Sequence, residues 1–187
     1  MGLFDRIRHT LRGGEATAAP ASSTPTNLAD LAVGWMVDYD LRTWQVTDHE
    51  HYTFNDGATA DEWELSSGHD RLYLERSDDD GEVEWSISRP LPIERLEGVR
   101  DHILQHDDPP DAIEYGGRTF RMEWSVGGSV RPVAGGEERR LIEWELLDAD
   151  EEHFLAIQQW GDTEFTASEG EVVQPFLFTH LLAGSPS

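Results

Sequence analysis

Two pairs of histidines have spacings that could begin a metal site. His102 and His106 are four residues apart, which places both rings on one face of a helix. Zinc peptidases with this spacing carry a glutamate next to the first histidine, but Ile-Leu-Gln separates the pair here. His49 and His51 alternate along an expected strand and share a face, without an identifiable third ligand. We therefore interpret all four as surface histidines and predict no metal site.

Signatures of other chemistries are incomplete or absent in the sequence. The acidic run Asp78-Asp79-Asp80-Gly81 has Arg76 where a calcium loop needs its first aspartate and Ile87 where it needs its glutamate, so we interpret the run as a hairpin turn. There is no nucleophile elbow, no phosphate-binding loop, no dinucleotide fingerprint and no cysteine. We predict no catalytic residues, no cofactor and no enzyme activity, with a triad assembled from distant positions as the alternative.

Tryptophans beside carboxylates form the remaining candidate site. The segment Glu62-Trp63-Glu64-Leu65 recurs as Glu143-Trp144-Glu145-Leu146. An indole flanked by acids suits a di- or polyamine, through cation–π and ion-pair contacts. The alternative is a core strand that buries Trp and Leu on one face and exposes both carboxylates to water. The candidate ligand residues are Trp63, Glu64, Trp144 and Glu145.

The recurrence of this segment indicates an internal duplication. Leu74 lies eleven residues after Trp63, and Leu155 lies eleven after Trp144. Further blocks before and after the segment match in the same order, although two copies are fewer than a solenoid needs. We expect a mainly β protein in which two duplicated antiparallel β-meanders form small barrel or sandwich lobes joined by a short helical connector.

Composition divides the chain into five parts. Residues 13–27 are rich in Gly, Ala, Ser, Thr and Pro and are typical of a flexible linker. Apolar residues at positions 93, 96, 99 and 103 predict a helix over Ile93 to His106. The expected order is a basic amphipathic segment (1–12), the linker (13–27), the first β-meander (28–92), the helical connector (93–110) and the second β-meander (111–183).

The first twelve residues carry three arginines between apolar residues at helical spacing. A cationic segment with an apolar face on a tether suits docking to an anionic membrane surface or into a groove of a partner protein. The alternative is a frayed tail, because isolated helices of this length are marginal in water. The docking residues we predict are Leu3, Phe4, Ile7 and Leu11.

The charge of the chain is strongly negative and its basic residues are all arginine. The 187 residues include 38 acidic and 14 basic side chains, giving a formal charge of −24, and lysine is absent. This composition keeps a protein hydrated at high salt and predicts a halophilic host, with an ordinary acidic protein as the alternative. Nucleic acid is excluded as a partner, because it requires a clustered cationic face. Without a membrane-spanning run or a signal-peptide core, we expect a cytoplasmic protein.

Several short motifs follow one another along the chain: Val33-Gly34, Val37, Tyr39, Trp63-Glu64-Leu65, Leu72-Tyr73-Leu74-Glu75, Leu155 to Trp160 and Gly170. Their order is similar to that of the family catalogued as domain of unknown function 4178. The resemblance spans most of residues 28–182, and Trp35 departs from it because relatives often have an acidic residue there. It implies a β-rich domain of bacteria and archaea, encoded near polyamine-synthesis-like enzymes, small membrane proteins and envelope-stress proteins, with no established catalytic residues.

These observations predict a non-catalytic accessory domain. We expect it to dock to a partner protein at the inner face of the cytoplasmic membrane through residues 1–12, in connection with envelope stress. The alternative is a protein that binds a polyamine-type cation, or an enzyme of polyamine metabolism.

The halophilic interpretation predicts that salt stabilises the fold. Self-repulsion of the acidic side chains in dilute buffer destabilises the compact state, and KCl screens it. The melting temperature, followed by circular dichroism, should therefore rise from dilute to multimolar KCl. A melting temperature that does not change with KCl would contradict the interpretation.

Overall fold

The computed structural model describes residues 27–184. Eleven strands, one α-helix and three short 3-10 helices make up this part of the chain. The strands are β1 (Met36–Tyr39), β2 (Arg42–Phe54), β3 (Thr59–Ser67), β4 (Asp70–Asp79), β5 (Glu82–Leu91), β6 (Ala112–Tyr115), β7 (Arg118–Pro132), β8 (Arg139–Leu147), β9 (His153–Gln159), β10 (Phe165–Val172) and β11 (Thr179–Leu182). The helices are α1 (Val99–His106), η3 (Leu28–Asp30), η4 (Ile93–Arg95) and η5 (Pro175–Leu177).

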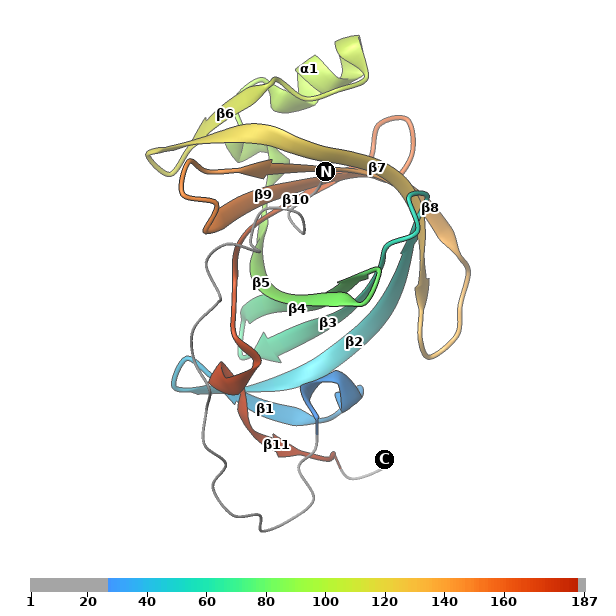
Figure 1. Cartoon of the computed structure of the whole chain (residues 1–187), viewed down its shortest axis with the longest axis vertical. Helices are drawn as coiled ribbons and strands as arrows, with labels where there is room; N and C mark the ends of the chain where they lie inside the picture. The colour runs from blue at the N-terminus through green and yellow to red at the C-terminus, as the bar shows by residue number, and fades with distance from the viewer. Residues whose placement is uncertain (1–26, 185–187) are drawn as a thin grey trace.

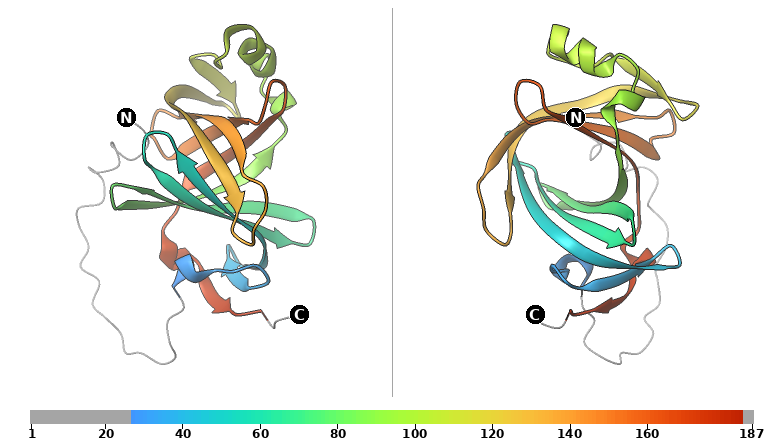
Figure 2. Two further views of the ribbon diagram at one scale, coloured as in Figure 1. Left: turned by 90° about the vertical axis from the view of Figure 1, so that its right-hand side faces the viewer. Right: turned by 180° about the vertical axis from the view of Figure 1, so that it is seen from behind.

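The strands form one antiparallel sheet that closes into a barrel (Figure 1). The order β2-β3-β4-β5-β10-β9-β8-β7 returns to its start because β2 also pairs with β7, from Glu50 opposite Pro132 to Phe54 opposite Gly128. β11 and β1 extend the sheet beyond β2, and β6 extends it beyond β7, so these strands lie outside the closed ring (Figure 2). The mainly β prediction is confirmed, but the strands form one barrel instead of two lobes.

The two longest strands, β2 and β7, each contain a bulge. One part of each strand packs its apolar side chains outside the barrel, and the other part packs them inside. The register of β2 shifts between Val46 and Asp48, and that of β7 shifts between Met122 and Trp124. An extra residue in a strand moves the following side chains to the opposite face. Residues before each bulge therefore pack outside the barrel, and apolar residues after it, such as Tyr52, point inside.

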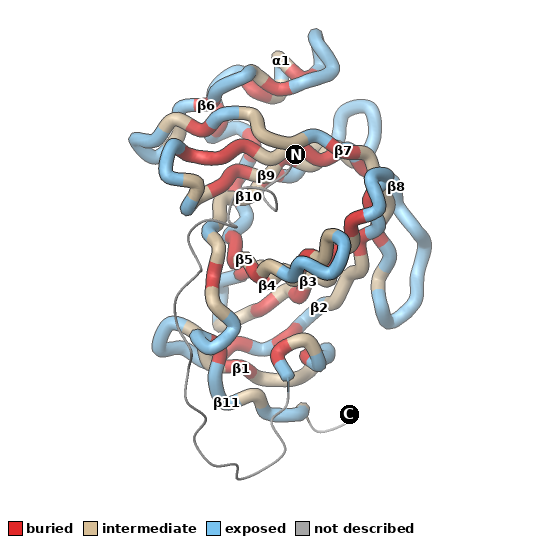
Figure 3. The backbone as a smooth tube through the Cα atoms, viewed as in Figure 1, coloured by how far each residue is buried: buried red, intermediate tan, exposed pale blue. Residues whose placement is uncertain are grey.

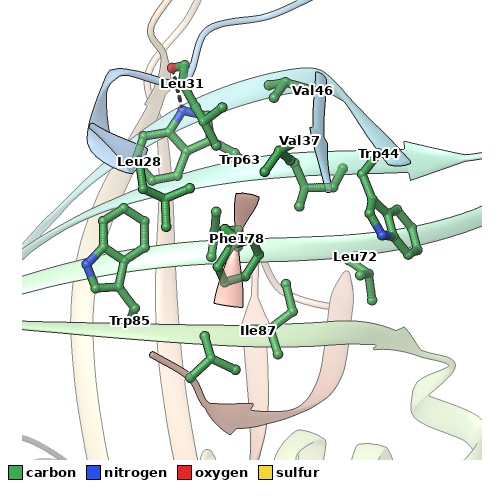
Figure 4. Close-up of a cluster of buried hydrophobic side chains, with 13 residues drawn as sticks. Leu28, Leu31, Val37, Trp44, Val46, Trp63, Leu72, Trp85, Ile87 and Phe178 are labelled. Carbon is green, nitrogen blue, oxygen red and sulfur yellow. Dashed lines mark hydrogen bonds between the residues drawn. The ribbon is translucent and has the colours of Figure 1, made fainter. Parts of the chain in front are cut away.

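The largest apolar clusters lie outside the barrel wall. One is covered by η3, η5, β1 and β11, and Trp63 at its centre is 1% exposed and donates its indole N–H to the carbonyl of Leu31 at 2.9 Å (Figure 4). The other is covered by η4, α1 and β6, and Trp144, also 1% exposed, donates to Oδ1 of Asp108 at 3.0 Å. Buried positions consequently follow the wall all around the ring and continue under the outer elements (Figure 3).

The connector between the halves is interrupted where the sequence predicts one helix. Ile93, Leu96, Val99 and Ile103 are all buried, as their spacing predicts. Gly98, with φ of +72°, separates η4 from α1. A left-handed residue cannot continue a right-handed helix, so the predicted helix begins only at Val99.

The buried tryptophans should be essential to stability. Trp63→Ala or Trp144→Ala removes a large side chain from an outer cluster and leaves the bonded carbonyl or carboxylate without its donor. Each should lower the free energy of unfolding by about 3–5 kcal/mol. Urea denaturation measures this loss. Replacement of the exposed Val83 by Ala is the control and should cost much less, and a comparable loss there would contradict the packing.

Candidate functional site

The interior of the barrel is lined with glutamates. Successive side chains of a strand point to opposite faces of the sheet. Where the apolar residues of a wall strand face an outer cluster, the residues between them therefore face the interior. The segment around Trp63 therefore places Glu62 and Glu64 inside, and that around Trp144 places Glu143 and Glu145 inside. The inward carboxylates on the wall are Glu50, Glu62, Glu64, Glu75, Glu84, Glu143 and Glu145.

Two cavities follow one another along this interior. The large cavity, of about 680 Å³, opens at the end where β3 meets β4 and β9 meets β10, and it is lined by six carboxylates and one arginine, Arg139. The small cavity, of about 40 Å³, lies deeper and is lined by Glu75, Glu84, Glu143 and Glu145. Ala156 borders both cavities. The carboxylates of the large cavity are Asp48, Glu50, Glu62, Glu64, Glu94 and Glu164.

Burial raises the pKa of Glu62 in the large cavity to about 8. Burial is the largest cause of this value, the charges of Glu50 and Glu143 also contribute to it, and a hydrogen bond from the Tyr52 hydroxyl at 3.2 Å acts in the opposite direction. The pKa of Glu50 is also raised, chiefly by burial and then by Asp48. Removing carboxylates from water favours their neutral form. Glu62 in the large cavity therefore holds its proton at neutral pH unless a cation replaces it.

The glutamates that line the small cavity also have raised pKa values. Burial, together with the charges of Glu143 and Glu84, raises the pKa of Glu145 to about 8. Burial also raises the pKa values of Glu143 and Glu84 to about 7. Gln158 donates to Glu143 at 2.7 Å and lowers its pKa. One buried oxygen each of Glu84 and Glu145 has no hydrogen-bond partner within the described chain. Unpaired buried oxygens of this kind are costly.

Two arginines form ion pairs with carboxylates at the mouth of the large cavity. The guanidinium of Arg139 lies 4.1 Å from the ring centre of Trp160 and 3.6 Å from Glu164. Nε of Arg71 lies 3.2 Å from Glu64, whose other oxygen accepts from Thr47 at 2.7 Å. The two arginines therefore neutralise Glu164 and Glu64, which lie near the opening of the cavity. Within residues 27–184, no arginine forms an ion pair with Glu62, Glu75, Glu143 or Glu145.

The structure separates the predicted ligand residues. Trp63 and Trp144 point away from the barrel into the outer clusters, whereas Glu64 and Glu145 point inside. A joint site of an indole and its neighbouring carboxylate is therefore wrong, and so is the expectation that these carboxylates face water. Aromatic rings do line the large cavity, but they are Tyr52, Tyr73, Trp160 and Phe165. The strand alternation around Trp63 and Trp144 is the signal that could have identified the inward glutamates.

The histidine pairs make local contacts. His49 and His51 share a face, as predicted, and both contact Oδ1 of Asp61, at 3.1 and 3.2 Å. The rings of His102 and His106 are 4.4 Å apart, and Nδ1 of His102 lies 2.8 Å from the carbonyl of Asp108. No group of three or more potential metal ligands within residues 27–184 is placed to hold an ion. The acidic run at 78–81 forms the end of β4 and its turn to β5, which confirms the predicted hairpin turn.

The predicted docking residues Leu3, Phe4, Ile7 and Leu11 lie outside the described residues, so docking stays a prediction. None of the helices in the described part has the length and apolarity needed to cross a membrane.

Comparison with known proteins identifies a family. A family model described as Domain of unknown function (DUF4178) matches residues 32–175, which is most of the chain. No curated protein and no solved structure matches the chain.

The raised pKa values predict that the protein loses stability as the pH rises. A carboxyl that binds its proton more tightly when folded than when unfolded contributes stability below about pH 4.5, and this contribution is lost as the pH rises through the folded pKa of about 8 for Glu62 and Glu145. The free energy of unfolding should therefore fall between pH 5 and 9, on the order of a few kcal/mol. Urea denaturation at constant salt measures it.

Glutamine variants test which groups cause the slope. Glu62→Gln and Glu145→Gln keep the side-chain shape without a titrating group, so each should flatten the pH dependence. Glu97→Gln, in the exposed connector, is the matched control and should leave it unchanged. The same slope in all four proteins would show that the interior carboxylates do not titrate in this range.

Proposed function

The chain belongs to the DUF4178 family, and we propose that this member is a non-catalytic module that binds a small organic cation with two or more amino groups inside its barrel. The observation that carries the proposal is the large cavity, in which six carboxylates face one guanidinium. Its volume of about 680 Å³ lies within the range of small-molecule sites.

The spacing of the carboxylates favours a linear di- or polyamine over a monoamine. Glu62 and Glu64 occupy alternate positions of β3, and Glu143 and Glu145 those of β8. Residues two apart along a strand are separated by about 6.8 Å. The nitrogens of an extended chain with three or four methylenes between them are about 5–6 Å apart, given bond lengths of about 1.5 Å. Successive ammonium groups therefore meet successive carboxylates.

The aromatic rings of the large cavity support the same class of ligand. Tyr52, Tyr73 and Trp160 lie among the carboxylates, and ring faces attract ammonium groups. Trp160 is already covered by the guanidinium of Arg139. Arg139 thus occupies a position that an ammonium group of the ligand would take, and it shows that this part of the mouth accommodates a cation. The methylene chain of a polyamine would lie against the apolar wall at Leu91 and Phe165.

A second candidate is an enzyme that acts on the same kind of cation. The observation in its favour is that Glu62 and Glu145 have pKa values of about 8, within the range of general acids and bases. Turnover of a bound amine that stops in Glu62→Gln would favour the enzyme over the module.

We also infer that the two halves of the barrel derive from a duplication. Three features support it. The bulges of β2 and β7 occur at matching places. Thr43 donates to Asp38 as Thr119 donates to Glu114. Arg42 pairs with Asp70 at the β3–β4 turn at 2.7 Å, and Arg118 pairs with Asp148 at the β8–β9 turn at 2.6 Å. A duplicated half-barrel would place a carboxylate pair on each side of the ligand.

The proposal predicts binding of spermidine that strengthens with pH. The ammonium groups must replace protons on the carboxylates, so affinity measured by isothermal titration calorimetry should rise from pH 6 to 8.5. Glu62→Gln and Glu64→Gln, at alternate positions of β3 on the wall of the large cavity, should each weaken binding about tenfold, the equivalent of one charge-assisted contact. Glu97→Gln is the control and should bind normally. Absence of binding at pH 8.5, or full affinity in Glu62→Gln, would overturn the proposal.

A further inference from the structure

We propose that the small cavity is a subsite for a terminal primary ammonium group of the ligand, which Glu84 and Glu145 bind while the rest of the amine chain passes Ala156 into the large cavity. This inference rests on the proposed function, because it assigns one end of the same ligand to a second place in the barrel. It also defines the ligand further, as a linear amine with an unsubstituted amino group at one end.

Two buried oxygens without a partner indicate a ligand in the small cavity. Oε1 of Glu84 and Oε1 of Glu145 are shielded from solvent, and neither has a hydrogen-bond partner among residues 27–184. Glu84 is on β5 and Glu145 is on β8, and β10 and β9 separate these strands in the wall (Figure 1). The two side chains therefore reach one cavity from separate parts of the ring. A buried acceptor without a donor is costly, and a ligand that donates to both oxygens removes that cost.

A primary ammonium group supplies what the lining of this cavity lacks. Neither arginine nor histidine occurs among the described residues that line it. Burial raises the pKa values of Glu84 and Glu145, as expected where no cation offsets the loss of water. An ammonium group carries one positive charge and three N–H donors. It can therefore donate to both unpaired oxygens and keep one donor for another acceptor of the lining, such as Ser86.

The volume of the small cavity limits which end group can enter. It measures about 40 Å³, and a water molecule takes up about 30 Å³ in the liquid. An ammonium group is close to water in size and fits this space, whereas a trimethylammonium group is too large for it. Phe54, Trp124 and Phe154 supply aromatic rings to the lining, and ring faces attract ammonium groups.

Ala156 stands at the boundary between the two cavities, and its small side chain lines both. Glu62 in the large cavity lies directly opposite Glu75 in the small cavity, on the paired strands β3 and β4. Directly opposed residues have Cβ atoms about 4.5–5.5 Å apart. The next nitrogen of an amine chain, about 5–6 Å from the first, therefore reaches Glu62 when the first is in the small cavity. A third nitrogen, as in spermidine, would reach Glu64 in the same way.

Methylation of a diamine tests the size limit without changing its charge. Putrescine and tetramethonium both have four methylenes between two positively charged nitrogens, but each nitrogen of tetramethonium carries three methyl groups and no N–H donor. Only putrescine can place an end group in the small cavity. Isothermal titration calorimetry at pH 8.5 should therefore give putrescine an affinity at least about tenfold higher than that of tetramethonium.

Ala156→Val tests the location of the end group. The larger side chain narrows the boundary between the cavities, so putrescine should lose about tenfold in affinity, the equivalent of one charge-assisted contact, whereas tetramethonium should keep its own. Ala112→Val adds the same two methyl groups at an exposed position of β6, outside the ring, and should change neither affinity. Glu145→Gln keeps the side-chain shape and should also weaken putrescine alone, with Glu97→Gln as its control. It provides the second variant if Ala156→Val does not fold.

The outcomes separate this inference from the proposed function. A loss of putrescine affinity alone in Ala156→Val and Glu145→Gln supports the subsite. Equal losses for both diamines, or no loss for either, would overturn the subsite and leave the large cavity as the binding site. If neither the diamines nor spermidine bind to the unaltered protein at pH 8.5, the proposed function is wrong and the subsite is wrong with it.

Discussion

The pairing of β2 with β7 is the contact on which the rest of the structure depends. It joins the two ends of the wall through the backbone between Glu50 and Phe54 and their partners on β7. Without it the polar faces of the strands would be open to water, and the glutamates would be ordinary surface groups. With it they face one another across a closed interior, and their pKa values rise because water no longer surrounds them.

Closure also explains why the main apolar clusters lie outside the wall. A sheet needs an apolar layer to pack against, and here the short helices and the added strands supply it on two sides. The interior of the barrel therefore does not have to bury all of the apolar side chains of the protein. Its apolar residues gather beside Phe54 and Phe154, near the end away from the large cavity, and carboxylates occupy much of the remainder. The stability provided by the outer clusters offsets the cost of an acidic interior.

The strands and turns could be predicted from the sequence, but the closure of the sheet into a barrel could not. Alternation identified Trp63 and Trp144 as strand residues with a buried face, and acidic or Gly-containing runs marked the turns. The same alternation is equally consistent with polar faces toward solvent or toward an interior, because local pattern carries no information about closure. Deciding between them requires the distant contact of β2 with β7. Gly98 was not recognised as a helix break, since a buried apolar pattern continued across it.

An interior of this kind couples proton and cation binding. A buried carboxylate can be neutralised by a proton, by a bound cation or by the guanidinium group of an arginine of the chain. Because the charge of Glu143 raises the pKa of Glu62, and the charges of Glu143 and Glu62 raise that of Glu75, neutralising one glutamate lowers the pKa of its neighbours. A ligand with several positive charges satisfies more of them at once than separate monovalent ions, and it loses less translational entropy for each contact. On the proposed function, the barrel would therefore bind a multivalent cation in preference to K⁺, and the pH would set how strongly.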